Sequence, residues 1–285
     1  MKIAHFWTRG TGEASASDGR LIRVVARGWS DETPEMAARV ARDVATRLAQ
    51  KIASGDRTKG GYLYGDRPLP EPIIREFAGP QFPRALITRN SYGALVMNAQ
   101  ELMFIDIDRE DGHHNAQDLF SGLKSLFGGR ANTPPANPVL EQIRRVAEAN
   151  SLSGRVYKTA AGYRVAITNA AYQPATPNSE SLLRQFGADP LYVRLCQVQQ
   201  SFRARLTPKP WRCDVPTPPV SFPYETSSDQ AQFREWESRY TAASANYATC
   251  HFVTSFGGGR VAAEFEDLLQ HHDDVTKAGS QLPLA

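Results

Sequence analysis

The chain has 285 residues, with 33 lysine and arginine residues against 30 acidic ones, so its formal net charge is +3. This length predicts one large domain or two small ones, and it is enough to bury a substantial core. Three cysteines without a Cys-x-x-Cys pair exclude a four-thiolate zinc site and argue for a reducing compartment. We find neither a secretory signal nor a run of membrane-span length, so we expect a cytoplasmic protein without a membrane partner.

The N-terminal region predicts a strand, a helix and a loop. Residues 21–29 are rich in β-formers and are bounded by glycines, which is typical of a strand. Thr33 followed by Pro34 is typical of a helix N-cap and first helical position. The helix expected over residues 34–54 has a basic face, and its apolar residues at helical spacing are Met36, Val40, Val44, Leu48 and Ile52.

Three short apolar runs follow over residues 84–89, 94–97 and 102–108, joined by turns. They predict an antiparallel meander in which the third strand does not lie at the edge of the sheet. That strand ends in Asp106 and Asp108, which are two residues apart and therefore project from the same face.

These two aspartates are the strongest functional signal in the sequence. Aspartate is depleted in strands, and two neighbouring carboxylates repel each other unless a cation lies between them. Mg²⁺ or Mn²⁺ would satisfy both, because these ions prefer oxygen ligands. Asp106 and Asp108 are therefore candidate catalytic and metal-binding residues. The alternative is a strand that ends in a polar loop, with Arg109 or a lysine neutralising both acids.

Residues 154–159 and 163–168 flank a tight Ala-Ala-Gly turn and predict a β-hairpin. Lys158 lies just before this turn and Arg164 just after it. Helices are expected around the hairpin over residues 118–127, 138–150, from 179, from 190, 230–245 and 261–272.

A basic stretch over residues 202–212 places four cations among proline, phenylalanine and tryptophan. Arginine forks match phosphate oxygens, and the two prolines stiffen the backbone. The stretch predicts contacts with the phosphates of a nucleotide or nucleic acid. The alternative is a solvated basic loop in which Trp211 plugs the core. The candidate phosphate-binding residues here are Arg203, Arg205, Lys209 and Arg212.

Two of these stretches together resemble the catalytic core of the archaeo-eukaryotic primase superfamily. The first motif of that family is an apolar strand ending in two acids, which residues 104–108 match. In the polymerase domains of bacterial ligase D, the second motif reads like Lys-Thr-Ser-Gly-Gly-Lys-Gly-Leu-His-Val, and residues 158–165 look like a shorter version. The resemblance implies that the two acids hold divalent metals and that Lys158 and Arg164 contact phosphates.

The sequence also departs from that family. Arg164 takes the place of a histidine that contacts the nucleotide, and only Cys213-Asp214 offers a match to the third motif, an apolar residue followed by an acid. We therefore expect a primase-polymerase-like protein that binds a nucleoside triphosphate or nucleic acid with Mg²⁺ or Mn²⁺, its catalysis altered or lost. The alternatives are a non-catalytic nucleic-acid or phosphate-binding module and another Asp-x-Asp metal-dependent transferase.

The alternation of hairpins and helices predicts an α+β fold, with helices packed on a mostly antiparallel sheet. We expect an N-terminal region over residues 1–80, a primase-like core over 81–275 and a flexible tail over 276–285, together forming one compact unit.

Overall fold

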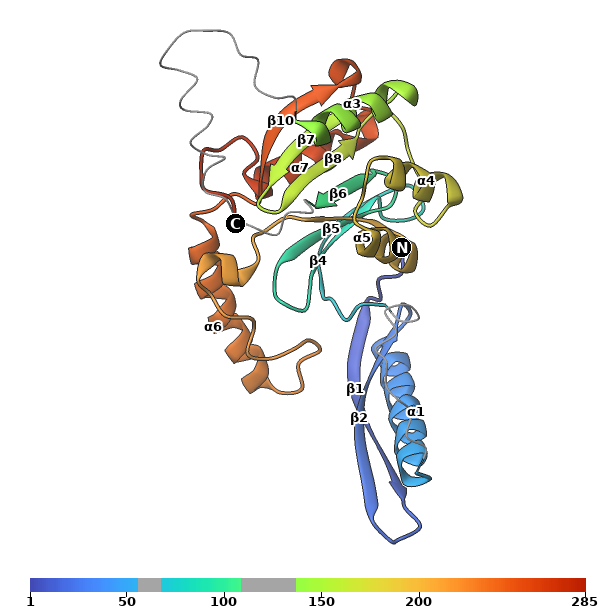
Figure 1. The fold of residues 1–285 in the computed structure, drawn as a ribbon. Coiled ribbons are helices and arrows are strands. Elements are labelled where there is room, and N and C mark those ends of the chain that lie inside the picture. The colour runs from blue at the N-terminus through green and yellow to red at the C-terminus, as the bar shows by residue number, and fades with distance from the viewer. Residues whose placement is uncertain (56–67, 109–136) are drawn as a thin grey trace.

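A computed structural model of the chain describes residues 1–55, 68–108 and 137–285. It has an α+β fold, as the sequence predicts, and its described strands form three antiparallel sheets. Figure 1 shows a long N-terminal arm that extends from a body containing the other two sheets. The helix expected over residues 118–127 lies outside the described residues.

The arm consists of a β-hairpin, strands β1 (Phe6–Ser15) and β2 (Leu21–Ser30), with helix α1 (Pro34–Ala53) along one face. The helix begins as predicted, because the side chain of Thr33 accepts a hydrogen bond from the backbone N–H of Met36 at 3.1 Å. The expected apolar stripe is not the buried face, however. The helix residues buried against the hairpin are Ala37, Ala41, Ala45 and Ala49.

Close backbone approach explains why alanine fills this interface. A Cβ atom added at Gly12 would lie 2.2 Å from the backbone nitrogen of Thr46, and one added at Gly28 would lie 2.3 Å from the carbonyl oxygen of Ala37. The helix therefore lies almost directly on the backbone of the hairpin, where larger side chains do not fit. The larger apolar residues lie at the margin, so that Leu48 and Ile52 remain 38% and 48% exposed.

The body contains two four-stranded sheets. The first has the strand order β10-β7-β8-β6, with β6 (Phe104–Asp108), β7 (Gly154–Thr159), β8 (Gly162–Ile167) and β10 (Cys250–Phe256). The second has the order β3-β4-β5-β9, with β3 (Ile73–Phe77), β4 (Ala85–Arg89), β5 (Leu95–Ala99) and β9 (Phe202–Arg205).

This topology corrects three expectations. The predicted meander is wrong in its third strand, because β5 pairs with β9 and β6 pairs with β8 in the other sheet. Among the described strands β8 is the only partner of β6, which therefore lies at an edge. The boundary expected at residue 80 also falls inside the β3-β4 hairpin, so β3 belongs to the body.

Helices cover both faces of the first sheet. One face is covered by α3 (Pro138–Ala149), α4 (Pro177–Gln185) and α5 (Pro190–Gln199), and the other by α7 (Glu266–Thr276). Helix α6 (Ser227–Ser244) lies away from this sheet and contacts η1 (Pro210–Cys213). The other short 3₁₀ turns are η2 (Gly257–Gly259) and η3 (Ala263–Phe265).

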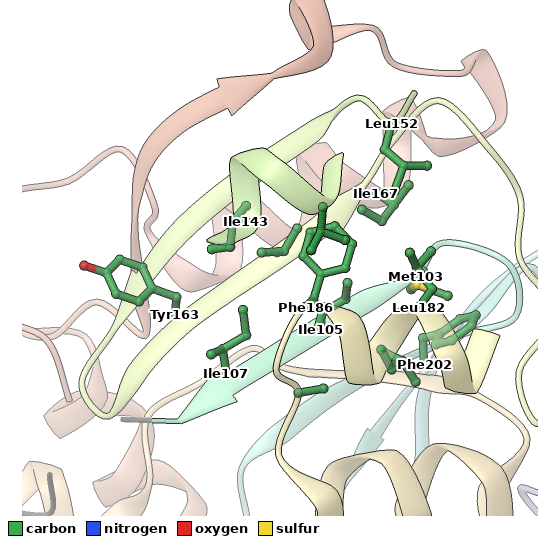
Figure 2. Close-up of a cluster of buried hydrophobic side chains, with 14 of the residues drawn as sticks. Met103, Ile105, Ile107, Ile143, Leu152, Tyr163, Ile167, Leu182, Phe186 and Phe202 are labelled. Atoms are coloured by element: carbon green, nitrogen blue, oxygen red, sulfur yellow. The ribbon is translucent and has the colours of Figure 1, made fainter. Parts of the chain in front are cut away.

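Figure 2 shows how β6 is fixed in the sheet. Ile105 and Ile107 point into one hydrophobic cluster with Ile143 of α3 and with Phe186. On the opposite face, Phe104 belongs to a second cluster formed with strands of the other sheet and with α7. Because side chains alternate along a strand, Asp106 and Asp108 project on the Phe104 side.

The C-terminal residues expected to form a flexible tail are instead packed on the body. The backbone N–H of Ala248 donates to the Pro283 carbonyl at 2.9 Å, and that of Ala285 donates to the Ala248 carbonyl at 3.0 Å. The Ala285 residue is 1% exposed. None of the helices that the structure describes has the length and apolar content needed to cross a membrane.

Candidate functional site

The two acids of β6 have different surroundings. Asp106 lies directly opposite Arg164 in the β6-β8 register, and Arg164 donates from Nε to Oδ1 at 2.8 Å and from Nη2 to Oδ2 at 3.2 Å. The arginine side chain is 2% exposed, whereas the Asp106 side chain is 33% exposed. An arginine therefore neutralises Asp106, and this arginine is Arg164 of β8. Arg109, the arginine considered from the sequence, lies outside the described residues.

Arg164 is held in place by a buried polar network. Its Nη1 donates to the carbonyl oxygen of Arg205 at 2.8 Å and lies 3.4 Å from Nε2 of His272. The other ring nitrogen of His272 contacts Oδ1 of Asp273 at 2.8 Å, and Oδ2 of Asp273 forms an ion pair with Arg155 at 2.6 Å. Burial lowers the pKa of the fully buried His272, and the hydrogen bond to Asp273 only partly opposes this effect. A neutral imidazole fits the network, donating to Asp273 and accepting from Arg164.

Among the described residues Asp108 has no comparable partner, and it is exposed. Desolvation raises the pKa of its carboxyl group, and the negative charges of Asp106 and Asp189 raise it further. The charges of Lys209 and Arg212 oppose the shift. Asp108 is therefore the acid whose ionised form would gain most from a nearby cation.

The third acid near this site is Asp189, which the sequence did not single out as a site residue. Its backbone N–H donates to the Asp106 carbonyl at 3.1 Å, and its Oδ1 accepts from the N–H of Tyr192 at the start of α5 at 2.8 Å. The candidate chosen from the sequence, Asp214, is exposed at the end of η1 and is not among the principal causes of the Asp108 shift. The sequence does predict a helix start near Asp189, but its approach to β6 depends on tertiary structure.

Two of the predicted phosphate-binding residues, Lys209 and Arg212, act electrostatically on Asp108, and a third, Arg205, acts on Lys209. Burial lowers the pKa of Lys209, and the charges of Arg205 and Arg212 lower it further. The Nη1 atom of Arg212 is buried and has no hydrogen-bond partner among the described residues. Lys209 is thus repelled by two neighbouring arginines, and one of these carries a buried donor that no described residue satisfies.

Arg203 and Lys158 are placed differently. Arg203 is buried and donates to both carboxylate oxygens of Glu71, at 2.8 and 3.1 Å, and to the side-chain oxygen of Asn98 at 2.7 Å. These contacts give it a structural role, so we leave it out of the phosphate-binding group. Lys158 lies with its Nζ 4.7 Å from the centre of the Tyr163 ring, and it is not a principal cause of the Asp108 shift.

Asp106 and Asp108 suit a metal ion only if a bound ligand supplies further oxygen atoms. In the described ranges, no three histidine, cysteine, aspartate or glutamate side chains form a set that could hold a metal ion. Asp106 shares both carboxylate oxygens with Arg164, which leaves Asp108 as the more available ligand. Proteins commonly bind Mg²⁺ through one or two carboxylates together with substrate phosphates. The residues therefore suit an ion that arrives with a polyphosphate, rather than a self-sufficient metal centre.

Comparisons of the chain with protein-family models, with curated proteins and with solved structures found no match. The relation to the primase superfamily thus stays a hypothesis based on the residues themselves.

Proposed function

We propose that this protein binds the polyphosphate of a nucleoside triphosphate together with one divalent cation, on a primase-polymerase-like scaffold. The observation that carries the proposal is the buried Nη1 of Arg212, which has no hydrogen-bond partner in the part of the chain that the structure describes and which lies near Lys209. Guanidinium groups bind phosphate oxygens through paired, charge-assisted hydrogen bonds. A phosphate here would satisfy the buried donor and relieve the repulsion among the three cations.

The metal would enter with the phosphates. Asp108 would hold it, and Asp106, oriented by Arg164, would lie beside it. A bound divalent ion neutralises phosphate charge and thereby stabilises the complex. Lys209 and Arg212 would bind the phosphate oxygens, because both lie close enough to Asp108 to act electrostatically on its carboxylate.

The same geometry argues for binding without turnover. Phosphoryl transfer by two metals needs carboxylates that can share two ions. Asp106 is engaged by Arg164 through both of its oxygens, and Asp189 uses one oxygen to accept from the N–H of Tyr192. The alternative, a metal-dependent nucleotidyltransferase, predicts extension of a primed template by the wild-type protein and its loss in Asp108→Asn.

Calorimetric titration with ATP, in the presence of Mg²⁺ or Mn²⁺, tests the proposal. Arg212→Gln should weaken binding about tenfold or more, because a hydrogen bond to a charged group contributes about 1.5–3 kcal/mol. Arg145→Gln, on the exposed face of α3, is the matched control and should bind like the wild type. Equal affinities for the wild type and Arg212→Gln, or no ATP binding at all, would contradict the proposal.

A further inference from the structure

Trp211 is an exposed aromatic side chain in the middle of the proposed phosphate site. It lies on η1 between Lys209 and Arg212, and it is 51% exposed, whereas Trp236 is 1% exposed. The ring of Tyr92 meets it in an edge-on arrangement with 5.3 Å between centroids. The Nζ atom of Lys209 lies 5.5 Å from the ring centre. Trp211 is therefore not packed in the hydrophobic core, which was the alternative considered from the sequence.

The turn that carries Trp211 is firmly held. Tyr240 of α6 donates its hydroxyl to the Pro208 carbonyl at 2.6 Å, and the N–H of Val215 donates to the Pro210 carbonyl at 3.1 Å. Each proline also fixes its own φ angle. The indole is thus presented by a backbone that loses little further freedom when a ligand binds.

The turn that carries Tyr92 is anchored to the same helix. Gly93 has a φ of +94°, and a Cβ added there would lie 2.0 Å from the Trp236 ring of α6. Arg89 donates from Nη1 to the Gly93 carbonyl at 2.8 Å and forms an ion pair with Glu237 of α6. Both aromatic side chains therefore come from turns braced on α6, which keeps them next to each other.

We infer that Trp211, with Tyr92 at its edge, is a stacking platform for the base of a nucleotide. This inference rests on the proposed function, because Lys209 and Arg212, on either side of Trp211, are the residues assigned to the phosphates. A cationic ligand is disfavoured, since Lys209 already lies over the indole and two arginines are close by. An inorganic polyphosphate or a simple sugar phosphate would leave the indole uncovered. The ligand class is therefore a nucleoside polyphosphate, with little preference among bases because every base has a π-face.

Two ligands and three variants test this inference. ATP and inorganic triphosphate, both with Mg²⁺, are titrated into the wild type, Trp211→Leu, Trp211→Phe and Phe82→Leu. Phe82 is 68% exposed outside the site and serves as the matched control. Trp211→Leu should weaken ATP binding roughly tenfold to a hundredfold and leave triphosphate binding unchanged. Trp211→Phe should retain most of the ATP affinity, and Phe82→Leu should change neither affinity.

The possible results separate the two proposals. If triphosphate binds and Trp211→Leu holds ATP as tightly as the wild type does, the base platform is wrong and the phosphate site stands. If Trp211→Leu lowers the affinities for ATP and triphosphate equally, Trp211 acts through its phosphate-binding neighbours, and the stacking role is again wrong. If neither ligand binds the wild type, both proposals fail.

Discussion

Asp106 and Arg164 lie opposite each other on β6 and β8, joined by contacts of 2.8 and 3.2 Å. This pairing makes the two acids of β6 chemically unequal, since the charge of Asp106 is neutralised by Arg164 while that of Asp108 is only partly offset by Lys209 and Arg212. It also gives a physical role to Arg164 that needs no ligand. The Arg164 side chain fixes the position of Asp106. Its nitrogen atoms already donate hydrogen bonds to Asp106 and to the Arg205 carbonyl.

The first prediction follows from the burial of Arg164. Asp106→Asn removes the only carboxylate that the described residues pair with this 2% exposed guanidinium. Removing one partner of a buried ion pair lowers the free energy of unfolding by about 3–5 kcal/mol. We expect a value at the lower end of this range, because the Asp106 carboxylate is partly exposed. Urea denaturation measures the change in the free energy of unfolding.

Asp108→Asn is the matched control, because it removes a carboxylate two residues away that is exposed. Its stability should stay within about 0.5 kcal/mol of the wild type. Equal stabilities for the two variants would mean that the Asp106–Arg164 pair contributes little to the fold. The contrast also makes Asp108→Asn the cleaner variant for testing metal binding.

The second prediction concerns acid sensitivity through His272. Burial lowers the pKa of this histidine below its ordinary value of 6.5, so the folded protein keeps it neutral when the unfolded chain is already protonated. A depressed pKa gives stability that is present above pH 6.5 and is lost as the pH falls below that value. Protonation would also place a second cation against Arg164, and Asp273, with a smaller contribution from Asp106, would compensate for it.

Unfolding free energies measured across this range should fall with acidification by up to about 1.4 kcal/mol per pH unit from this one group. His272→Gln should flatten the slope, whatever its effect on absolute stability. A slope that persists in His272→Gln would assign the acid sensitivity to other groups.

Local structure was predictable because its causes are close in sequence. Thr33 and Pro34 start α1 as expected, and Asn137 caps α3 by accepting from the N–H of Val139 at 3.1 Å. The hairpin of β7 and β8 also agrees with its turn signal. Caps and tight turns are set by a few neighbouring residues, so their patterns can be read without knowing the fold.

The long-range relations could not be predicted in this way. The apolar run before Asp106 and Asp108 predicts a buried strand that ends in two acids. It does not reveal that this strand, β6, pairs with β8 instead of β5. The sequence alone makes Arg203 a candidate phosphate ligand. The structure shows that it instead donates a hydrogen bond to Glu71, which lies 132 positions earlier in the chain. Helical periodicity likewise indicated the apolar stripe of α1, but gave no sign of how closely the helix backbone approaches Gly12.

The third prediction uses that close approach. Gly12→Ala places a Cβ 2.2 Å from the Thr46 nitrogen, so α1 must move away from the hairpin. Overpacking of this kind costs about 1–3 kcal/mol, although alanine by itself suits a strand better than glycine does. Hydrogen exchange should show faster exchange of the β1 and β2 amides. Gly279→Ala, where an added Cβ meets nothing within 4 Å, should leave their exchange unchanged. Unaltered protection in Gly12→Ala would mean that the helix can move aside at no cost.

The last prediction separates a structural arginine from a ligand-binding one. Arg203→Gln leaves the 6% exposed carboxylate of Glu71 without its cation, which should cost about 3–5 kcal/mol of stability. Arg212→Gln removes a group whose Nη1 has no described partner, so stability should change little while ATP affinity falls. Replacing Arg203 and Glu71 together by methionine should recover most of the stability, because an apolar pair can substitute for a buried ion pair. Urea denaturation and calorimetry on the same preparations measure both effects. If Arg203→Gln instead weakened ATP binding as much as Arg212→Gln under conditions where it stays folded, Arg203 would return to the phosphate-binding group.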